Sequence, residues 1–330
     1  MALNSWGSGS GLSTVGQYNI GIGQTAGYGS SATGEYNVMV GTSAMYSRTS
    51  GEKNTVIGTN AGYAITEGNY NTAVGNDSLK SCTTGNNNTA IGHVAGDAIT
   101  TGVQNTLTGI EAGGAITTGS YNTFSGTNSG KTVTEGEYNS FYGNGSGKVA
   151  TDGDHNTGIG RRALYSLTTG SQNTTLGSNS GNTLTTGSNN VILGYDAESS
   201  AADVSNEVTL GNSNISSLRC QVQTISSLSD ERDKTDITSL DLGLDFIDSL
   251  RPVKFKWDSR EGITKDGTIE AGFIAQDFQK AQKDNDADYL GLVYDKNPDR
   301  LEASYGKLVP VLVKAIQELK QEIQTLKQNG

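Results

Sequence analysis

A short motif returns at a fixed interval through more than half of this 330-residue chain. Each copy has an Asn followed by a short β-prone run, with Gly three residues before the Asn and Gly four residues after it. The spacing is 17 residues, except for 18 between the first two copies. The eleven copies begin at Asn19, Asn37, Asn54, Asn71, Asn88, Asn105, Asn122, Asn139, Asn156, Asn173 and Asn190. A unit this short cannot bury its own apolar face, so the copies must stack into a solenoid.

The residue types predict that each coil is built of β-structure. Segments such as 55–57 and 191–193 are short, rich in β-branched residues and bounded by turn residues, and we expect two short strands per coil. The repeated Gly supplies positive φ at corners, and the repeated Asn bonds to the backbone and to the Asn of the next coil. Eleven coils about 4.7 Å apart would form a rod on the order of 50 Å long. We therefore predict a parallel β-solenoid over residues 16–197, with a structural ladder that includes Asn54, Asn71, Asn88, Asn105 and Asn122.

Composition limits the classes of partner and cofactor. The formal net charge of −11 argues against a nucleic-acid partner. No apolar stretch is long enough to span a bilayer and residues 1–16 show no secretory signal, so we predict no membrane insertion. Cys82 and Cys220 lie far apart without metal-ligand spacing, and both are interpreted as structural thiols that a bacterial cytoplasm keeps reduced. The sequence predicts neither a metal site nor a cofactor.

Each coil contributes few large apolar groups, so a single chain is expected to be marginally stable. Small residues such as Ala44, Ala61, Ser78 and Ala95 recur at one coil position and would let three chains approach a common axis. The motif from Asn88 to Ala95 resembles the head repeats of trimeric autotransporter adhesins, and the resemblance covers roughly residues 16–197. It implies a trimeric β-roll. The repeat is longer here and no export signal or anchor is recognised, which favours a virus fibre over a bacterial surface adhesin.

Tyrosines recur just before the Asn and nine positions after it. Ladder stacking along the surface is the favoured interpretation, and platforms for sugar rings are the alternative. The residues are Tyr18, Tyr36, Tyr70, Tyr121 and Tyr138 in the first row and Tyr28, Tyr46, Tyr63 and Tyr165 in the second.

The repeat fades after residue 197, and the composition shifts at Ser229 towards Lys, Asp and Glu. Residues 198–228 are expected to form an intertwined β neck. Four motifs then resemble the intramolecular chaperone domain at the C-termini of phage tailspikes, endosialidases and long tail fibres, of the peptidase S74 type. They are Ser229–Ile237, Leu250–Trp257, Gly272–Gln276 and Tyr305–Leu319. The resemblance implies an α+β chaperone domain over residues 229–330 that directs trimer assembly.

The last segment also predicts a coiled coil from its own spacing. Pro310 suits a first helical turn. Apolar residues alternate in the spacing of positions a and d for nearly three heptads, so the helix is expected to associate with copies of itself. A single amphipathic helix packed on its own domain is the alternative. The a residues are Val309, Ile316 and Ile323, and the d residues are Leu312, Leu319 and Leu326.

In the family that the domain resembles, the chain is cut before the Ser of the first motif once three chains have assembled. Here that is the bond between Leu228 and Ser229. The resemblance implies Ser229 as nucleophile and Lys234 as general base in a single-turnover endopeptidase reaction, because a serine hydroxyl needs a base and a buried lysine can serve as one. The alternative is that Ser229 caps a turn while Lys234 pairs with Asp230 or Asp233. Many relatives carry a His near the third motif, where this chain has Glu270.

Together these features predict a homotrimeric phage tail fibre, made in the host cytoplasm and carried on the virion. Residues 1–15 would attach to virion tail or adaptor proteins, and a host surface glycan or protein would be the receptor. Because we expect the solenoid pairings to be non-local and intermolecular, the C-terminal domain would set the chain register. A tailspike depolymerase and a bacterial trimeric adhesin remain as alternatives. A depolymerase needs paired carboxylates in a cleft, whereas Asp97, Glu111, Glu135 and Asp152 lie at scattered coil positions.

Overall fold

The computed structural model describes residues 17–29, 32–221, 227–257, 267 and 269–329. The chain divides into two compact units, Met1–Asn212 and Ser213–Gly330. The predicted attachment segment, residues 1–15, and part of the predicted neck, residues 222–226, lie outside the described residues. No helix among the described residues is long and apolar enough to cross a bilayer.

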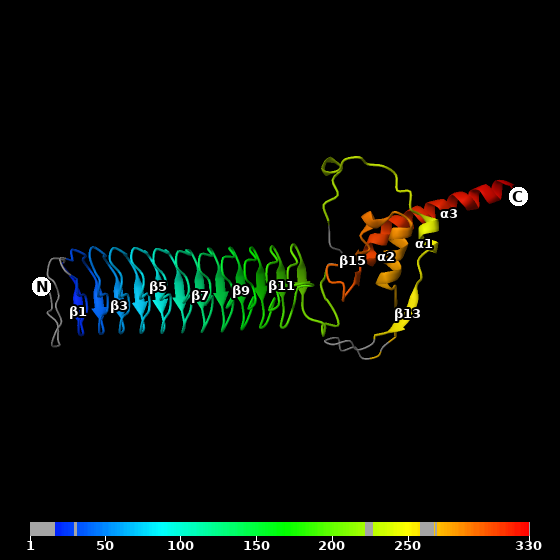
Figure 1. The fold of residues 1–330 in the computed structure, drawn as a ribbon. Helices are drawn as coiled ribbons and strands as arrows, with labels where there is room; N and C mark the ends of the chain where they lie inside the picture. The colour runs from blue at the N-terminus through cyan, green and yellow to red at the C-terminus, as the bar shows by residue number, and fades with distance from the viewer. Residues whose placement is uncertain (1–16, 30–31, 222–226, 258–266, 268, 330) are drawn as a thin grey trace. The chain divides into compact units, whose positions relative to one another are not determined.

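The first unit is a solenoid with a single sheet of twelve parallel strands in chain order (Figure 1). Partners are 17 residues apart, as in the pairing of Thr89 with Thr106, and 18 apart only between the first two strands. The strands are β1 (Ile20–Ile22), β2 (Val38–Val40), β3 (Thr55–Ile57), β4 (Thr72–Val74), β5 (Thr89–Ile91), β6 (Thr106–Thr108), β7 (Thr123–Ser125), β8 (Ser140–Tyr142), β9 (Thr157–Ile159), β10 (Thr174–Leu176), β11 (Val191–Leu193) and β12 (Val208–Leu210). The predicted parallel β-solenoid is confirmed.

Two details of that prediction are wrong. Each described coil carries one strand and not two, because two of its corner positions adopt left-handed backbone that ends an extended run. Asn60 has φ of 53° and Tyr70 has φ of 58°, in addition to the positive φ of the repeated Gly. The strands also pair within one chain, so the sheet is not built from intermolecular pairings.

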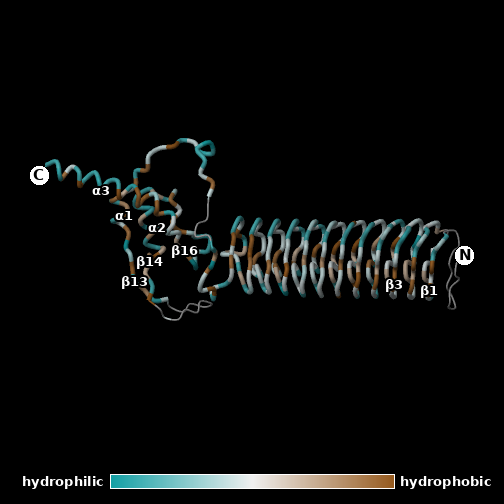
Figure 2. Tube along the Cα trace, turned by 180° about the vertical axis from the view of Figure 1, so that it is seen from behind, coloured by the Kyte–Doolittle hydropathy of each residue, from teal (hydrophilic) through white to brown (hydrophobic). Residues whose placement is uncertain are grey.

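The interior of the solenoid is filled by the middle residue of each strand. Val56, Leu107 and Phe124 are fully buried, and Figure 2 shows hydrophobic segments recurring from coil to coil. The small residues of the repeat, such as Ala44 and Ala95, are fully buried there as well. The prediction that they line an axis between three chains is therefore wrong, since these side chains fill the core of their own coil.

The predicted asparagine ladder is present along the whole sheet. The backbone N–H of Asn105 donates to Oδ1 of Asn88 at 3.0 Å, and its side-chain Nδ2 donates to the carbonyl of Gly119 at 2.9 Å. The same pair of contacts recurs in neighbouring coils, as at Asn122. Because these side chains are fully buried, the ladder satisfies backbone groups that water cannot reach.

The Gly after each strand is required both by its backbone angle and by the close stacking of the next coil. Gly92 has φ of 142°, and a Cβ there would lie 2.4 Å from the carbonyl oxygen of Gly109 in the next coil. Any side chain would force the two coils apart, so the residue is needed for the 17-residue stacking itself.

The sheet continues one strand beyond the boundary predicted at residue 197. Glu207 lies 17 residues after Asn190, and its N–H donates to Oδ1 of Asn190 at 3.0 Å, as an Asn at that position would. Its carboxylate turns instead to the backbone N–H of Ser200, at 2.8 Å. The Asn-based repeat did not predict this last coil, because Glu207 stands where the other coils have Asn. Within residues 211–221 and 227–228 no strand follows β12, so the predicted β neck is not observed there.

The second unit is a small α+β domain with two two-stranded antiparallel sheets. Its core joins Phe246, Phe278, Leu292 and Val311 with three further buried residues. The elements are η1 (Glu231–Asp233), α1 (Leu244–Asp248), β13 (Val253–Lys256), β14 (Ile269–Gly272), α2 (Ala275–Asp284), η2 (Asp288–Leu290), β15 (Val293–Tyr294), β16 (Glu302–Ala303), η3 (Tyr305–Leu308) and α3 (Val309–Asn329).

Three of the four C-terminal motifs form the framework of this unit. The second motif is β13, the third runs from the end of β14 into α2, and the fourth is η3 with the first half of α3. The ring of Phe273 packs edge-on against Tyr305 at 5.5 Å, and the hydroxyl of Tyr305 lies 3.2 Å from the Phe273 backbone N–H that donates to it. The motifs therefore hold one another in place.

Helix α3 has two apolar faces. Val311 and Ala315 pack inward against the unit's own core. The six predicted a and d residues instead remain between 41% and 72% exposed. We call these six residues the α3 seam; they are Val309, Leu312, Ile316, Leu319, Ile323 and Leu326.

Candidate self-processing site

A single turn of 3-10 helix brings Ser229 and Lys234 together. Asp230 caps η1 by accepting a hydrogen bond from the backbone N–H of Arg232 at 2.9 Å. The turn ends at Lys234, whose backbone N–H donates to the carbonyl of Glu231 at 3.1 Å. One compact turn across five residues therefore returns the lysine side chain to the serine that precedes it.

The lysine amine lies within hydrogen-bond distance of the serine hydroxyl. Lys234 Nζ is 2.7 Å from Ser229 Oγ and 3.3 Å from the Ser229 carbonyl oxygen. A nucleophile and a base at this separation can exchange a proton directly. The two residues named by the resemblance are thus in contact in a single chain.

The alternative arrangement, in which Ser229 caps a turn and Lys234 pairs with Asp230 or Asp233, is not observed. Asp230, not Ser229, caps the turn. Arg232 binds both carboxylate oxygens of Asp230, at 3.0 Å and 2.6 Å, and these hydrogen bonds hold the pKa of Asp230 below its usual range. Among the described residues no carboxylate forms an ion pair with Lys234. Sequence reasoning missed Arg232, although its position two residues after the capping Asp is a local signal.

In a single chain this site is open to solvent. Leu228, the residue before Ser229, is 92% exposed, and Ser229 and Lys234 are exposed too. A lysine becomes an effective base when burial disfavours its charged form. The geometry of a Ser–Lys pair is therefore present here without the desolvation that would activate it.

Glu270 occupies an exposed position on β14, opposite Phe255 of β13. Its carboxylate makes no contact with Ser229 or Lys234 among the described residues. The described contacts of the pair therefore do not include Glu270.

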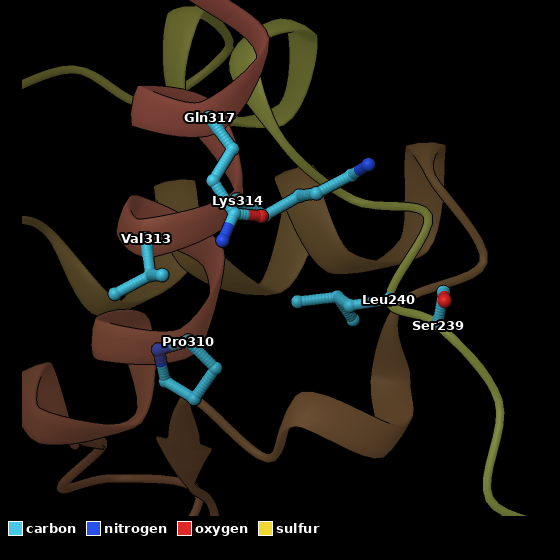
Figure 3. A pocket seen from close by; sticks show the side chains of 6 residues that line it. All are labelled: Ser239, Leu240, Pro310, Val313, Lys314 and Gln317. Atoms are coloured by element: carbon cyan, nitrogen blue, oxygen red, sulfur yellow. The ribbon is translucent and has the colours of Figure 1, made fainter.

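A shallow hollow of about 390 Å³ lies beside α3 (Figure 3). Its lining joins Leu240 to Pro310 and Val313 of the helix, and Lys314 is the ionisable residue among its lining side chains. Lys314 lies 3.3 Å from Glu318 in an ion pair along the helix. Ser239 also lines the hollow, but among the described residues no hydrogen bond joins its hydroxyl to Lys314.

The tyrosine rows of the solenoid form stacks. The rings of Tyr46 and Tyr63 are 5.0 Å apart at 3°, and those of Tyr121 and Tyr138 are 4.8 Å apart at 3°. The predicted ladder stacking is confirmed for these rings and for Tyr18, Tyr28 and Tyr36, whereas Tyr70 and Tyr165 contact cationic side chains. Since each ring face inside a stack is covered by its neighbour, a sugar ring could stack only at an open end.

Two acidic side chains considered for a depolymerase make contacts within the solenoid. Glu111 forms an ion pair with Lys131 at 2.5 Å, and Asp152 accepts a hydrogen bond from the Thr134 hydroxyl at 2.6 Å. Neither contact brings two carboxylates together in a cleft, as glycoside hydrolysis requires.

Comparison with known proteins identifies part of the second unit. Residues 229–286 match the peptidase S74 family model, described as the chaperone of endosialidase. The match begins at Ser229 and contains the first three motifs, while the fourth lies beyond it. No curated protein and no solved structure matches the chain. A β-solenoid followed by this domain fits a protein of the tail fibre or tailspike type.

Proposed function

We propose that this chain is a phage tail fibre whose C-terminal chaperone domain assembles three copies and then cuts itself off before Ser229. The observation that carries the proposal is the 2.7 Å contact between Lys234 Nζ and Ser229 Oγ, at the residue where the chaperone family match begins. The fibre would remain in the virion after the domain is released.

The α3 seam supports assembly through copies of the same helix. Six large apolar side chains at a and d spacing are exposed in one chain, whereas Val311 and Ala315, on the neighbouring face of the first half of α3, are packed on its own domain. Exposed apolar rows of this length mark an interaction surface. Knobs-into-holes packing of three α3 helices would bury the seam.

The proposed cleavage is an acyl transfer followed by hydrolysis. Lys234, in its neutral form, takes the proton of the Ser229 hydroxyl while Oγ attacks the carbonyl carbon of Leu228 through a five-membered ring. The C–N bond then breaks, the nitrogen of Ser229 takes up a proton from Lys234, and an ester joins Leu228 to Ser229 Oγ. Water hydrolyses this ester, which leaves a C-terminal carboxylate on Leu228 and restores the serine hydroxyl.

Assembly and cleavage are linked by the exposure of the pair. In a single chain Ser229 and Lys234 are in contact but exposed to solvent. Association of three chains would enclose the pair, disfavour the charged lysine and activate the base only after trimerisation. This order protects an incomplete assembly from premature loss of its chaperone.

The remaining roles follow from the two ends of the proposed fibre. The N-terminal segment would join virion tail or adaptor proteins. After cleavage the new end of the chain would lie at Leu228, and this end would meet a host surface glycan or protein receptor. No observation favours a depolymerase or a bacterial adhesin over this assignment.

The test is the intact mass, under denaturing conditions, of freshly purified full-length protein and of its Ser229→Ala variant. We expect two fragments that meet between Leu228 and Ser229 in the wild type and one full-length mass in the variant. Lys234→Met should also remain uncut, because the serine loses its base. Ser227→Ala, which changes a nearby serine outside the pair, is the matched control and should be cut like the wild type.

Either of two results would overturn the self-cleavage. One is a single full-length mass in both the wild type and Ser229→Ala. The other is cleavage of Ser229→Ala at the wild-type rate, which would assign the cut to another protease.

A further inference from the structure

The outward side of the solenoid sheet carries a mostly aliphatic row, interrupted in the middle by Thr108, Ser125 and Tyr142. In every strand the middle residue points inward and the first and third point outward, as the alternating burial shows. The third positions form what we call the outer row. Its members are Ile22, Val40, Ile57, Val74, Ile91, Thr108, Ser125, Tyr142, Ile159, Leu176, Leu193 and Leu210.

This row is exposed in a single chain. Ile91 is 42% exposed, and Leu176 and Leu210 are 52% exposed. The outward face of a sheet that meets water is normally polar, which makes nine aliphatic residues among twelve outer-row positions an unusual surface for a solitary solenoid.

Charge is absent from this side of the sheet as well. None of the 36 residues in the twelve strands is Asp, Glu, Lys or Arg. The acidic residues of the solenoid lie at other coil positions, as Glu67, Glu111 and Glu137 do. The chain thus keeps its charges away from a face that spans the whole sheet.

The face is long and narrow. Eleven inter-strand steps of about 4.8 Å give a length of roughly 50 Å, and three residues of about 3.3 Å each give a width of about 10 Å, or on the order of 500 Å² per chain. A standard interface takes about 800 Å² from each partner, so the outer row would supply a large part of the surface that a stable assembly needs.

We propose that the outer row is the surface by which the solenoid packs against two further copies of itself, side by side along a common axis. The inference rests on the proposed self-assembly and names the residues that perform it in the solenoid. The sequence predicted that small residues such as Ala44 and Ala95 would form the contacts between chains. The structure buries these residues inside each coil, and we assign the contacts between chains to the outer row instead.

A second copy is the occupant because both the chemistry and the spacing match. Two identical uncharged faces meet without like-charge repulsion. Identical 17-residue coils also place the aliphatic side chains of parallel copies at the same intervals along the axis.

The experiment is cross-linking of full-length protein with a short bismaleimide. The cysteine is introduced as Ile91→Cys in a Cys220→Ser background, and Cys82 stays unreactive because it is fully buried and burial raises its pKa to about 12. The matched control is Thr84→Cys, which is exposed at a coil position where other coils carry Glu67 or Glu135. The mass in solution of both variants is measured first.

We expect covalent dimers from Ile91→Cys, because each chain carries one reactive thiol, and at least tenfold less from Thr84→Cys. An assembled protein in which Thr84→Cys cross-links as well as Ile91→Cys would overturn the outer row while leaving the assembly intact. A wild type that is monomeric in solution would overturn the assembly and the outer row together.

A second pair of variants tests the same face by charge. Ile57→Glu with Ile91→Glu should lower the temperature at which the assembled protein unfolds, because six carboxylates would be forced into the shared axis. Thr84→Glu with Thr101→Glu adds the same charge at a position where Glu occurs naturally, and should unfold like the wild type. Equal unfolding temperatures for the two double variants would contradict the proposal.

Discussion

The solenoid and the C-terminal unit differ in how much of their structure one chain completes. In the solenoid the interior is closed by residues of the same chain, from the buried asparagine ladder to the stacked rings of Phe124 and Phe141. In the C-terminal unit a 21-residue helix is packed on one side and leaves the α3 seam exposed on the other. The first is complete in its core, and the second leaves a row of large apolar side chains exposed.

This difference changes what a chaperone domain has to do. Strands in the solenoid pair at a separation of 17 residues, so the coil-to-coil register is set by contacts that are close in sequence and inexpensive in loop entropy. The domain is therefore not needed to pair the strands. In the proposed fibre its task would be to bring three chains together and align them, after which the outer rows could meet.

The largest expected effect comes from breaking the α3 seam. Ile316→Glu places a carboxylate in the middle of the seam, where assembly would bury it without a partner. We expect association to weaken by roughly a hundredfold or more and the freshly made protein to be monomeric by light scattering, while its β circular-dichroism signal remains.

Gln321→Glu is the control for this change. It adds the same charge to the same helix at an exposed position away from the seam, and should leave the mass in solution unchanged. Loss of assembly in both variants would mean that charge on α3, and not the seam, controls association.

The fold was predictable where the spacing itself carries the information. The 17-residue interval of Asn and Gly predicts the coil and the ladder because an Asn can reach its equivalent only if coils stack in register. The direction of Ala44 and Ala95 was not predictable, because turns inside a 17-residue coil reset the alternation that tells inside from outside in a long strand. The last coil was missed because Glu207 replaces the Asn.

A smaller effect is expected inside the solenoid. Asn105→Ala removes the acceptor for the backbone N–H of Asn122, 3.1 Å away, and the donor to the carbonyl of Gly119. Both groups would remain buried and unsatisfied, which costs on the order of 3 kcal/mol of unfolding free energy. Denaturant unfolding measures this loss, and the mass in solution of the native protein should not change.

Thr101→Ala in the same region is the control, since its side chain is exposed, and it should change the unfolding free energy by less than about 0.5 kcal/mol. If Asn105→Ala changed the association of chains and Ile316→Glu did not, the solenoid ladder and not the α3 seam would control association. That result would contradict the comparison of the two units.

The candidate site was predictable only through resemblance. A Ser five residues before a Lys is common, and only the four motifs in order single out Ser229 and Lys234. Their contact depends on one turn of 3-10 helix, and on Arg232 engaging Asp230 so that the lysine stays available. The exposure of the pair is a property of the single chain, which no local pattern encodes.

The smallest expected effect concerns a carboxylate on the solenoid. Burial raises the pKa of Asp97, with Asp77 and Glu111 adding to the rise and Lys80 opposing it. The folded state therefore binds the proton more tightly than the unfolded state, so stability is greatest below the unfolded pKa near 3.8 and falls as pH rises through the higher folded pKa. Asp97→Asn removes this loss, and we expect the melting temperature at neutral pH to rise by about 1 °C.

Melting temperatures measured below the unfolded pKa of Asp97 and at neutral pH test this prediction. Asp97→Asn should gain at neutral pH relative to the wild type and lose the advantage below the unfolded pKa, where the wild-type carboxyl is protonated in both states. Asp203→Asn removes the same charge from an exposed position and should show no such crossover. An equal gain from both variants would mean that the solenoid responds to its overall negative charge. The half-buried carboxylate of Asp97 would then not limit the stability of its coil.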